Sequence, residues 1–203
     1  MLVATVITYN DMPLIKSTIE SIKDKVDKII AVDGRYRDFP DTNGDYSTDG
    51  TLEYLATINN VQLVFASGVD EVVKRNKYLE QVHDGDIVLN LDADEVLVGE
   101  VKNLDADFGI IDLHDGHSRH VQKRATRFFK YYEGMAYKNV HYTLYYNGRQ
   151  VNNLKKVING DFTYEDVKDF YLIHNWHLRS QTRQHSKSIY YKKLLRNEAG
   201  FPR

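Results

Sequence analysis

The chain contains no cysteine among its 203 residues. This absence excludes disulfide bridges, thiolate catalysis and cysteine-ligated zinc, and it leaves the cellular compartment undetermined. No apolar run approaches the ~18–20 residues that a membrane-spanning helix needs. Neither positive nor negative charge is in large excess, because the chain has 27 Lys and Arg residues and 29 Asp and Glu residues. A net charge of −2 gives no global field that favours nucleic acid, so we expect no nucleic-acid partner.

The composition that remains is typical of a folded globular protein. Hydrophobic residues make up 42% of the chain and charged residues 28%. A chain of this length can bury a full core, and we expect residues 1–203 to form one domain. The apolar residues 1–8 are short and lack a basic leader, so they indicate a first strand and not a signal peptide. We therefore expect a cytoplasmic protein.

The first hundred residues alternate between strand-like and helix-like patterns. Short β-branched runs predict strands, and apolar residues at three- and four-residue spacing predict helices. Such alternation is typical of an α/β fold with a mostly parallel central sheet and helices on both faces. The predicted strands are 2–8, 28–33, 61–65 and 87–91, and the predicted helices are 15–26, 51–58 and 69–82.

Beyond residue 100 the pattern becomes mostly strand-like. The predicted strands are 108–113, 126–132, 140–146 and 170–173, and a final helix is predicted over 181–196. The change divides the domain into two halves, residues 1–100 and a smaller β-rich half, residues 101–203. The final helix region is basic and contains no acidic residue from Arg179 to Arg196. It is interpreted either as a solvated surface or as a peripheral contact with an anionic membrane.

The sequence Asp92-Ala93-Asp94-Glu95 follows the fourth predicted strand. Side chains two residues apart on a strand point to the same side, so Asp92 and Asp94 are expected to project together. Ligands of open α/β sheets bind outside the carboxyl ends of the strands. Two carboxylates there suit a hard divalent cation that bridges to a diphosphate. The alternative is a solvated acidic turn.

Several segments together resemble the family-2 glycosyltransferases of GT-A fold. Their order and rough spacing match over residues 2–98, and the set is more specific than any one of its members. The segments are Ile7-Thr8-Tyr9-Asn10, Val32-Asp33-Gly34, Ser47-Thr48-Asp49-Gly50-Thr51, Arg75-Asn76 and Leu91-Asp92-Ala93-Asp94-Glu95.

This resemblance implies a metal-assisted transfer of a sugar, with inversion, from a nucleotide diphosphate donor, with UDP favoured. It assigns nucleotide binding to residues 1–100 and acceptor binding to residues 101–203. A glycan, a lipid-linked molecule or a protein would be the acceptor. The implied nucleotide-binding residues are Thr8, Tyr9, Asn10, Asp33, Arg75 and Asp92. The implied ligands of Mn²⁺ or Mg²⁺ are Asp92, Asp94 and His174, with Asp94 essential for catalysis.

The second half resembles one bacterial branch of the family more loosely, at Arg127-Phe128-Phe129-Lys130, Val140-His141 and Ile173-His174. That branch has a carboxylate after the valine–histidine pair, whereas this chain has Tyr142. An inverting displacement needs a base on the acceptor side. His141 is therefore the predicted catalytic base, and Asp112 is the carboxylate alternative.

Two other departures keep alternatives open. Residues 35–46 intervene where the family runs almost directly from the second strand into the Ser47 turn, so the pocket for the base is expected to be covered or reshaped. A metal-dependent nucleotidyltransferase also uses carboxylates, but no phosphate-cradling glycine-rich loop with a lysine occurs here. A non-catalytic module that binds nucleotide sugars or carbohydrate is the third interpretation.

Overall fold

The computed structural model describes residues 1–40, 44–139, 143–151 and 162–198. It has a mixed α/β architecture built on one eight-stranded sheet, with a small three-stranded sheet beside it. The strand order of the large sheet is β3-β2-β1-β4-β7-β6-β11-β5. Both predicted halves of the chain contribute strands to this sheet, so the boundary near residue 100 does not separate two sheets.

The first four strands are parallel and form one side of the sheet. The β-branched and leucine side chains of β1, β2 and β4 are buried on both faces, as expected for parallel strands covered by helices, whereas those of the edge strand β3 are only partly buried. The predicted strands are confirmed here to within one residue. They are β1 (Leu2–Thr8), β2 (Lys28–Asp33), β3 (Val61–Phe65) and β4 (Ile87–Asp92).

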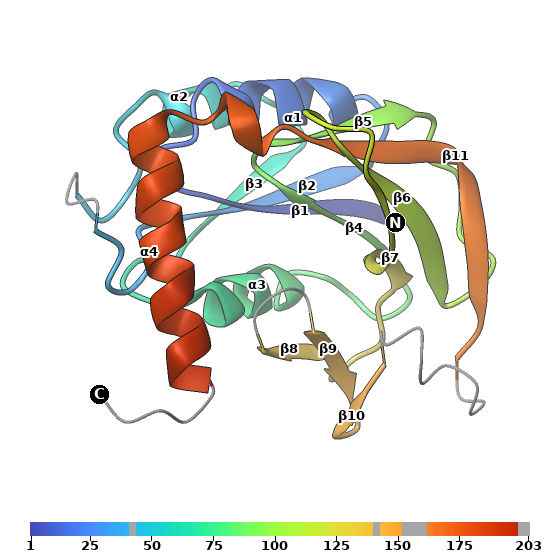
Figure 1. Cartoon of the computed structure of the whole chain (residues 1–203). Helices are drawn as coiled ribbons and strands as arrows, with labels where there is room; N and C mark the ends of the chain where they lie inside the picture. Colours follow the sequence, from blue (N-terminus) through green and yellow to red (C-terminus); the bar gives the residue numbers. More distant parts are fainter. Residues whose placement is uncertain (41–43, 140–142, 152–161, 199–203) are drawn as a thin grey trace.

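Helices cover both faces of this parallel part, as predicted. Helices α1 (Leu14–Ile22) and α2 (Thr51–Leu55) lie on one face, and α3 (Glu71–Leu79) lies on the other (Figure 1). The spacing of Ile15, Ile19 and Ile22 places all three against the sheet, where they are fully buried. Helix α3 is shorter than the predicted 69–82 at both ends, and it begins at Glu71 because the Asp70 carboxylate caps it by accepting from the Val73 N–H at 2.9 Å.

The remaining strands of the large sheet run in both directions. Strand β7 is antiparallel to β4 and β6, while β11 is parallel to β6 and antiparallel to β5. The sheet is therefore mixed rather than mostly parallel throughout, and β5 was not predicted. These strands are β5 (Glu95–Gly99), β6 (Phe108–Asp115), β7 (Val121–Lys130) and β11 (Tyr164–His174).

The small sheet packs against α3. It consists of β8 (Ala136–Asn139), β9 (Thr143–Tyr146) and β10 (Arg149–Gln150). The Asn76 side chain on α3 donates to the Tyr137 carbonyl at 2.9 Å and accepts from its N–H at 2.8 Å. This pair of hydrogen bonds satisfies backbone groups of β8 and fixes the small sheet to α3.

The final helix, α4 (Gln181–Glu198), follows a short 3₁₀ turn and lies across the carboxyl ends of the parallel strands (Figure 1). The Tyr190 ring packs against the rings of Tyr36 and Phe39 at centroid distances of 5.2 and 5.7 Å. Its hydroxyl accepts from the Glu71 N–H at 3.2 Å. None of the described helices is long and apolar enough to cross a membrane.

Candidate active site

The candidate site lies where β1 and β4 run side by side and end. After β1 the chain continues to β2 on one side of β1, whereas β4 lies on the other side, so the sheet has a topological switch point between β1 and β4. Ligands of open α/β sheets bind at such a point. A cavity of about 470 Å³ opens there, which is within the size range of small-molecule sites. We call it the switch-point cavity.

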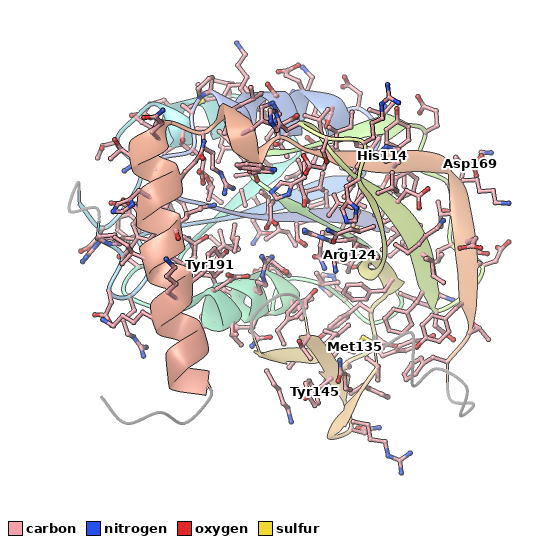
Figure 2. The ribbon with its side chains drawn as sticks, in the orientation of Figure 1. His114, Arg124, Met135, Tyr145, Asp169 and Tyr191 are labelled. Atoms are coloured by element: carbon pink, nitrogen blue, oxygen red, sulfur yellow. The ribbon has the colours of Figure 1, made fainter. Side chains whose placement is uncertain are left out.

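Cationic side chains outnumber acidic ones in the wall of the switch-point cavity. Arg124 of β7 and Tyr191 of α4, both labelled in Figure 2, line it from the sheet side and from the helix side. The lining itself is therefore more cationic than acidic and favours anionic ligands, while Glu95 and Asp94 directly behind it offset part of the charge of Arg127 and Arg179. The cationic lining residues are Arg75, Arg124, Arg127, Arg179 and Lys187, and the acidic ones are Glu71 and Asp92.

Asp92 ends β4 and is held from two sides by arginines. Its Oδ1 contacts the Arg75 guanidinium at 3.0 Å, and its Oδ2 contacts the Arg127 guanidinium at 3.1 Å. Arg75 is itself fixed by the buried Glu71 carboxylate at 2.8 Å. The Asp92 side chain is 25% exposed, so its oxygens remain open to the cavity. Since a carboxylate oxygen accepts more than one hydrogen bond, Asp92 can still accept from a ligand hydroxyl.

Glu95, at the start of β5, holds both Arg127 and the backbone of Asp92 in place. Its Oε1 contacts Arg127 at 2.6 Å, and its Oε2 accepts from the Asp92 N–H at 2.8 Å. Burial raises the pKa of the Glu95 carboxyl even though Arg127 lies against it. The side chain bonds across the turn between β4 and β5, which fixes the direction of Asp92.

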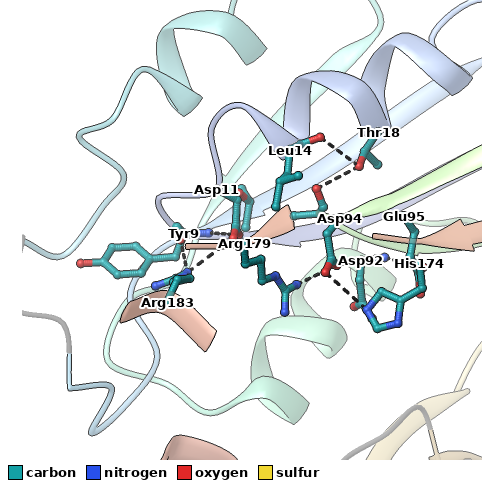
Figure 3. Close-up of polar contacts among 12 residues, drawn as sticks. Tyr9, Asp11, Leu14, Thr18, Asp92, Asp94, Glu95, His174, Arg179 and Arg183 are labelled. Carbon is teal, nitrogen blue, oxygen red and sulfur yellow. Dashed lines mark hydrogen bonds and ion pairs between the residues drawn. The ribbon is translucent and has the colours of Figure 1, made fainter. Parts of the chain in front are cut away.

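Asp94 lies beneath the cavity wall and is enclosed by cations from the C-terminal part of the chain (Figure 3). Its Oδ1 contacts the Arg179 guanidinium at 2.7 Å, and its Oδ2 contacts His174 Nε2 at 3.3 Å. The Asp94 side chain is 0% exposed. Burial alone would raise its pKa, but the hydrogen bond from His174 and the charge of Arg179 outweigh that effect, and the pKa of Asp94 is lowered. The same contact raises the pKa of His174 against the opposing effect of burial.

Asp11, after β1, forms a second acidic centre under α4. It accepts from the Tyr9 N–H at 3.0 Å, and its Oδ1 lies 3.6 Å from the Arg183 guanidinium. Burial would raise the pKa of Asp11, but the charges of Lys187 and Arg183 lower it. The Arg183 guanidinium also lies over the ring of Phe39, 4.6 Å from the centroid. Helix α4 is thus anchored at Asp11 as well as at Asp94 through the preceding turn.

The end of β2, where the sequence predicts contact with the nucleotide base, is covered by other parts of the chain. Asp33 at the end of β2 is buried and accepts from the Ser47 N–H at 2.9 Å and from the Ser47 hydroxyl. Burial raises the pKa of Asp33 despite these hydrogen bonds. Tyr9 is buried and donates its hydroxyl proton to the Gly44 carbonyl at 2.8 Å. The segment after β2 therefore covers this end of the sheet, as the sequence predicted.

Lys74 ties the ends of β1 and β2 together below this cover. Its buried ammonium donates to the Thr8 carbonyl at 2.8 Å and to the Gly34 carbonyl at 2.6 Å. Burial lowers the pKa of Lys74 to about 7, against the opposing charges of Asp33 and Asp11. Both β1 and β2 end at positions fixed by one side chain from α3.

The predicted site residues do not all meet in one place. Arg75, Asp92 and His174 line the switch-point cavity, and Asp94 lies beneath it. Asn10 instead lines a second cavity, of about 610 Å³, on the other side of Arg179. Thr8, Tyr9 and Asp33 are buried and line neither cavity.

The two predicted candidates for the catalytic base have different outcomes. His141 lies outside the described residues. Asp112 lies within them but does not line the switch-point cavity, and its carboxylate is 2.8 Å from the Lys123 ammonium. The position of Asp112 thus gives no support to its role as the base.

The side chains around Asp94 do not fit the divalent cation that the resemblance implies. A hard cation needs carboxylate oxygens that face the open site. Both oxygens of Asp94 are turned to Arg179 and His174 and have no exposed surface, and those of Asp92, which are partly open to the cavity, are already paired with Arg75 and Arg127. Within the described part of the chain, no group of three or more histidine and acidic side chains is arranged to hold a metal ion. Metal binding by Asp92, Asp94 and His174 stays a prediction that these contacts do not support.

Sequence reasoning missed the contribution of the C-terminal segment. Arg179, Lys187 and Tyr191 all line the switch-point cavity, and Arg183 binds beside it. The basic run that contains them was visible, but it was interpreted as an outward surface. The signal that could have indicated the inward orientation is the absence of acids in the run, combined with the acids that follow β1 and β4, Asp11 after β1 and Asp94 and Glu95 after β4.

No protein-family model matches the chain, and no curated protein matches its sequence. Two solved structures of S. aureus TarS are similar. One has a TM-score of 0.44 and 20% identity, over 60% of this chain and 23% of the TarS chain. The other, TarS 1-349, has a TM-score of 0.44 and 19% identity, over 62% and 40%. This chain spans less than half of either TarS chain, and neither fold nor activity is transferred at this level of similarity.

Proposed function

We propose that this chain is a glycosyltransferase with a GT-A-type fold, and that it moves a sugar from a nucleotide diphosphate donor to an acceptor hydroxyl with inversion. The motif order over residues 2–98 supports this proposal. The observation that carries it is the switch-point cavity, which brings together an excess of cationic lining side chains, the partly exposed Asp92 carboxylate and two tyrosines. An anionic diphosphate, a ribose and flat rings require these three kinds of group.

The roles of the individual residues follow from their exposure. Asp92 accepts hydrogen bonds from the ribose hydroxyls, because its oxygens face the cavity while Arg75 and Arg127 hold it in place. The cationic side chains bind the diphosphate and stabilise the charge that develops as it leaves. Tyr36 and Tyr191 offer rings to the base or the sugar. A uridine donor is proposed on the resemblance alone, since Ser47 already fills the hydrogen-bonding sites of Asp33.

The acceptor enters from the side of β6 and β7, where Leu113 and Gln122 line the cavity. The acceptor is a glycan, a lipid-linked molecule or a protein. His141 is kept as the proposed base, on the resemblance, and Asp112 as the alternative. In the reaction the acceptor oxygen bonds to the anomeric carbon as the bond from that carbon to the diphosphate breaks, and the base takes the hydroxyl proton.

The test is the release of nucleoside diphosphate from a panel of UDP-, GDP- and ADP-sugars, with EDTA and with Mn²⁺ in parallel. The proposal predicts release that increases when a suitable acceptor is added. Release of pyrophosphate from nucleoside triphosphates would instead assign a nucleotidyltransferase. Binding of nucleotide sugars with no release under any condition would assign a non-catalytic module.

A matched pair of variants localises the activity to the switch-point cavity. Arg124 and Arg119 are both exposed arginines of the same region, but only Arg124 lines the cavity. Loss of one hydrogen bond to a charged group costs about 1.5–3 kcal/mol, so Arg124→Gln should lower kcat/KM for the donor by roughly tenfold or more. Arg119→Gln should leave it unchanged. Equal effects of the two substitutions would place the reaction elsewhere.

A further inference from the structure

We propose that the switch-point cavity binds the diphosphate of its donor without a divalent cation, and that Arg179 and Lys187 supply the positive charge. This inference rests on the proposed function and names how the same site handles its leaving group. It is an alternative to the metal site that the motif Asp92-Ala93-Asp94 predicts. Three structural observations carry it: the closure of Asp94, the separate pairing of Asp92, and the position of Lys187.

The first observation is that Asp94 is closed to any ligand of the cavity. Its side chain has no exposed surface, and Arg179 and His174 lie against its two oxygens. The backbone is fixed as well, because the Asn175 N–H donates to the Asp94 carbonyl at 2.8 Å, just after β11 ends. A cation would have to displace both partners to reach Asp94. Arg179 thus occupies the place where a metal would meet this carboxylate.

The second observation is that Asp92 and Asp94 do not converge on one point. Asp92 is paired with Arg75 and Arg127, and Asp94 is paired with a different set of cations. Each carboxylate is therefore neutralised by its own partners before any ligand arrives. Two carboxylates attract a divalent cation only when their negative charge is uncompensated.

The third observation concerns positive charge that is not fully paired. Lys187 lines the cavity, and within the described ranges its ammonium has no ion-pair partner in contact, although the charges of Asp11 and Asp94 act on it from further away. Arg179 lines the cavity too; its guanidinium is paired with Asp94 at 2.7 Å, and its buried Nε lacks a hydrogen-bond partner among the described residues. A partly buried cation without a partner is costly, and an anion that binds beside it recovers that cost. Both groups line the same cavity, so one diphosphate can contact both.

These cations suit the chemistry of the proposed reaction. When the bond between the anomeric carbon and the β-phosphate oxygen breaks, its electron pair stays on the oxygen and the diphosphate gains one negative charge. Fixed positive charges that already face this oxygen stabilise the transition state without rearrangement. Guanidinium groups bind phosphate oxygens in pairs, whereas an ammonium acts as a point charge. Arg179 and Lys187 thereby perform the neutralisation that a metal performs elsewhere.

The test is titration calorimetry of UDP and of inorganic pyrophosphate in EDTA, repeated with Mg²⁺ or Mn²⁺. We expect both anions to bind in EDTA, with UDP affinity changed less than about threefold by metal. Lys187→Met should weaken UDP binding by about 10- to 100-fold, as expected for one hydrogen bond to a charged group. The matched control is Lys192→Met, which removes an exposed charge of the same helix that does not line the cavity.

Lys187→Arg, which keeps the charge, should retain most of the affinity and guards against misfolding of the Met variant. Binding that requires metal, or that is equal in Lys187→Met and Lys192→Met, would overturn the inference. So would failure of both anions to bind under every condition. This outcome can be distinguished from failure of the proposed function. Metal-free binding of UDP without sugar transfer would refute the glycosyltransferase activity but support the metal-free anion site. Sugar transfer that requires a metal would support the activity but refute the metal-free site.

Discussion

Replacing Asp94 by the isosteric Asn tests whether Asp94 belongs to an empty metal site or to a buried ion-pair cluster. The two alternatives predict effects of opposite sign on the stability of the fold. If Asp94 belonged to an empty metal site, its removal in EDTA would relieve repulsion from Asp92 and raise the melting temperature. In the structure Asp94 is instead the common partner of Arg179 and His174, with no exposed surface. Asp94→Asn leaves Arg179, only 11% exposed, without its counter-charge.

The size of the effect follows from the burial of the pair. Breaking a buried ion pair by removing one partner costs about 3–5 kcal/mol. Asn keeps a polar oxygen next to the Arg179 guanidinium, so we expect a loss near the lower end, about 3 kcal/mol. For a domain of this length each kcal/mol corresponds to about 2–4 °C, which gives a decrease in Tm of about 6–12 °C.

The pH of the assay matters because two partners titrate. The pKa of Asp94 is lowered on folding from 3.8, so its stabilisation is present above pH 3.8 and is lost as the pH falls through its folded pKa. The pKa of His174 is raised from 6.5, so its contribution is complete below pH 6.5 and is lost as the pH rises through its folded pKa. The difference between variant and wild type should be largest between these two values.

Thermal melting in EDTA, at a pH within that window, measures the effect. Asp24→Asn is the control, since Asp24 is an exposed carboxylate outside both cavities and should change stability by less than about 0.5 kcal/mol. An unchanged or increased Tm of Asp94→Asn would refute the reasoning, because it would mean that Asp94 is not compensated by Arg179 and His174.

Two further predictions concern the cavity and the strand ends. Burial and the charges of Arg179 and Arg183 lower the pKa of Lys187 to about 8, against the opposing charges of Asp11 and Asp94. Because a bound diphosphate favours the charged lysine, UDP affinity in EDTA should fall as the pH rises through about 8, by up to tenfold per unit; an equal decrease in Lys187→Met would contradict this. Gly34→Ala should destabilise the fold by at least about 2–3 kcal/mol in urea denaturation, because φ is +141° and a Cβ would lie 2.3 Å from the Ala66 carbonyl oxygen. Gly50 also has a positive φ, but a Cβ there would meet no atom within 4 Å, so Gly50→Ala should destabilise the fold less than Gly34→Ala. Equal losses of stability in the two variants would show that the structure relieves the overlap between the Gly34 Cβ and Ala66.

Local sequence patterns predicted the parallel half of the fold, because there each apolar run corresponds to one strand and each amphipathic segment to one helix. The β-branched runs match β1 to β4, and the isoleucines of α1 occupy one buried face. Strands β5, β8 and β10 were missed because each is short, and Glu95–Gly99 follows directly after an acidic turn that hides its start. The predicted position of the final helix, 181–196, was close to the observed one.

The direction of side chains was harder to predict than their position in a strand or helix. Asp94 was expected to share a face with Asp92, but β4 ends at Asp92 and the turn directs Asp94 toward Arg179. The partner of Asp33 is Ser47, fourteen residues away, and no local pattern identifies it. Arg179 and Lys187 face inward because α4 docks across the strand ends, which is a tertiary event without a signature in the helix itself.

The most direct test of the central claim is a crystal structure of the chain with UDP, grown in EDTA. The account predicts that the diphosphate lies in the switch-point cavity between the ends of β1 and β4, within hydrogen-bond distance of Arg179 and Lys187. It also predicts that Asp94 keeps its contacts with Arg179 and His174. A nucleotide bound elsewhere, or one that is seen only when a metal joins Asp94 to the phosphates, would contradict the account.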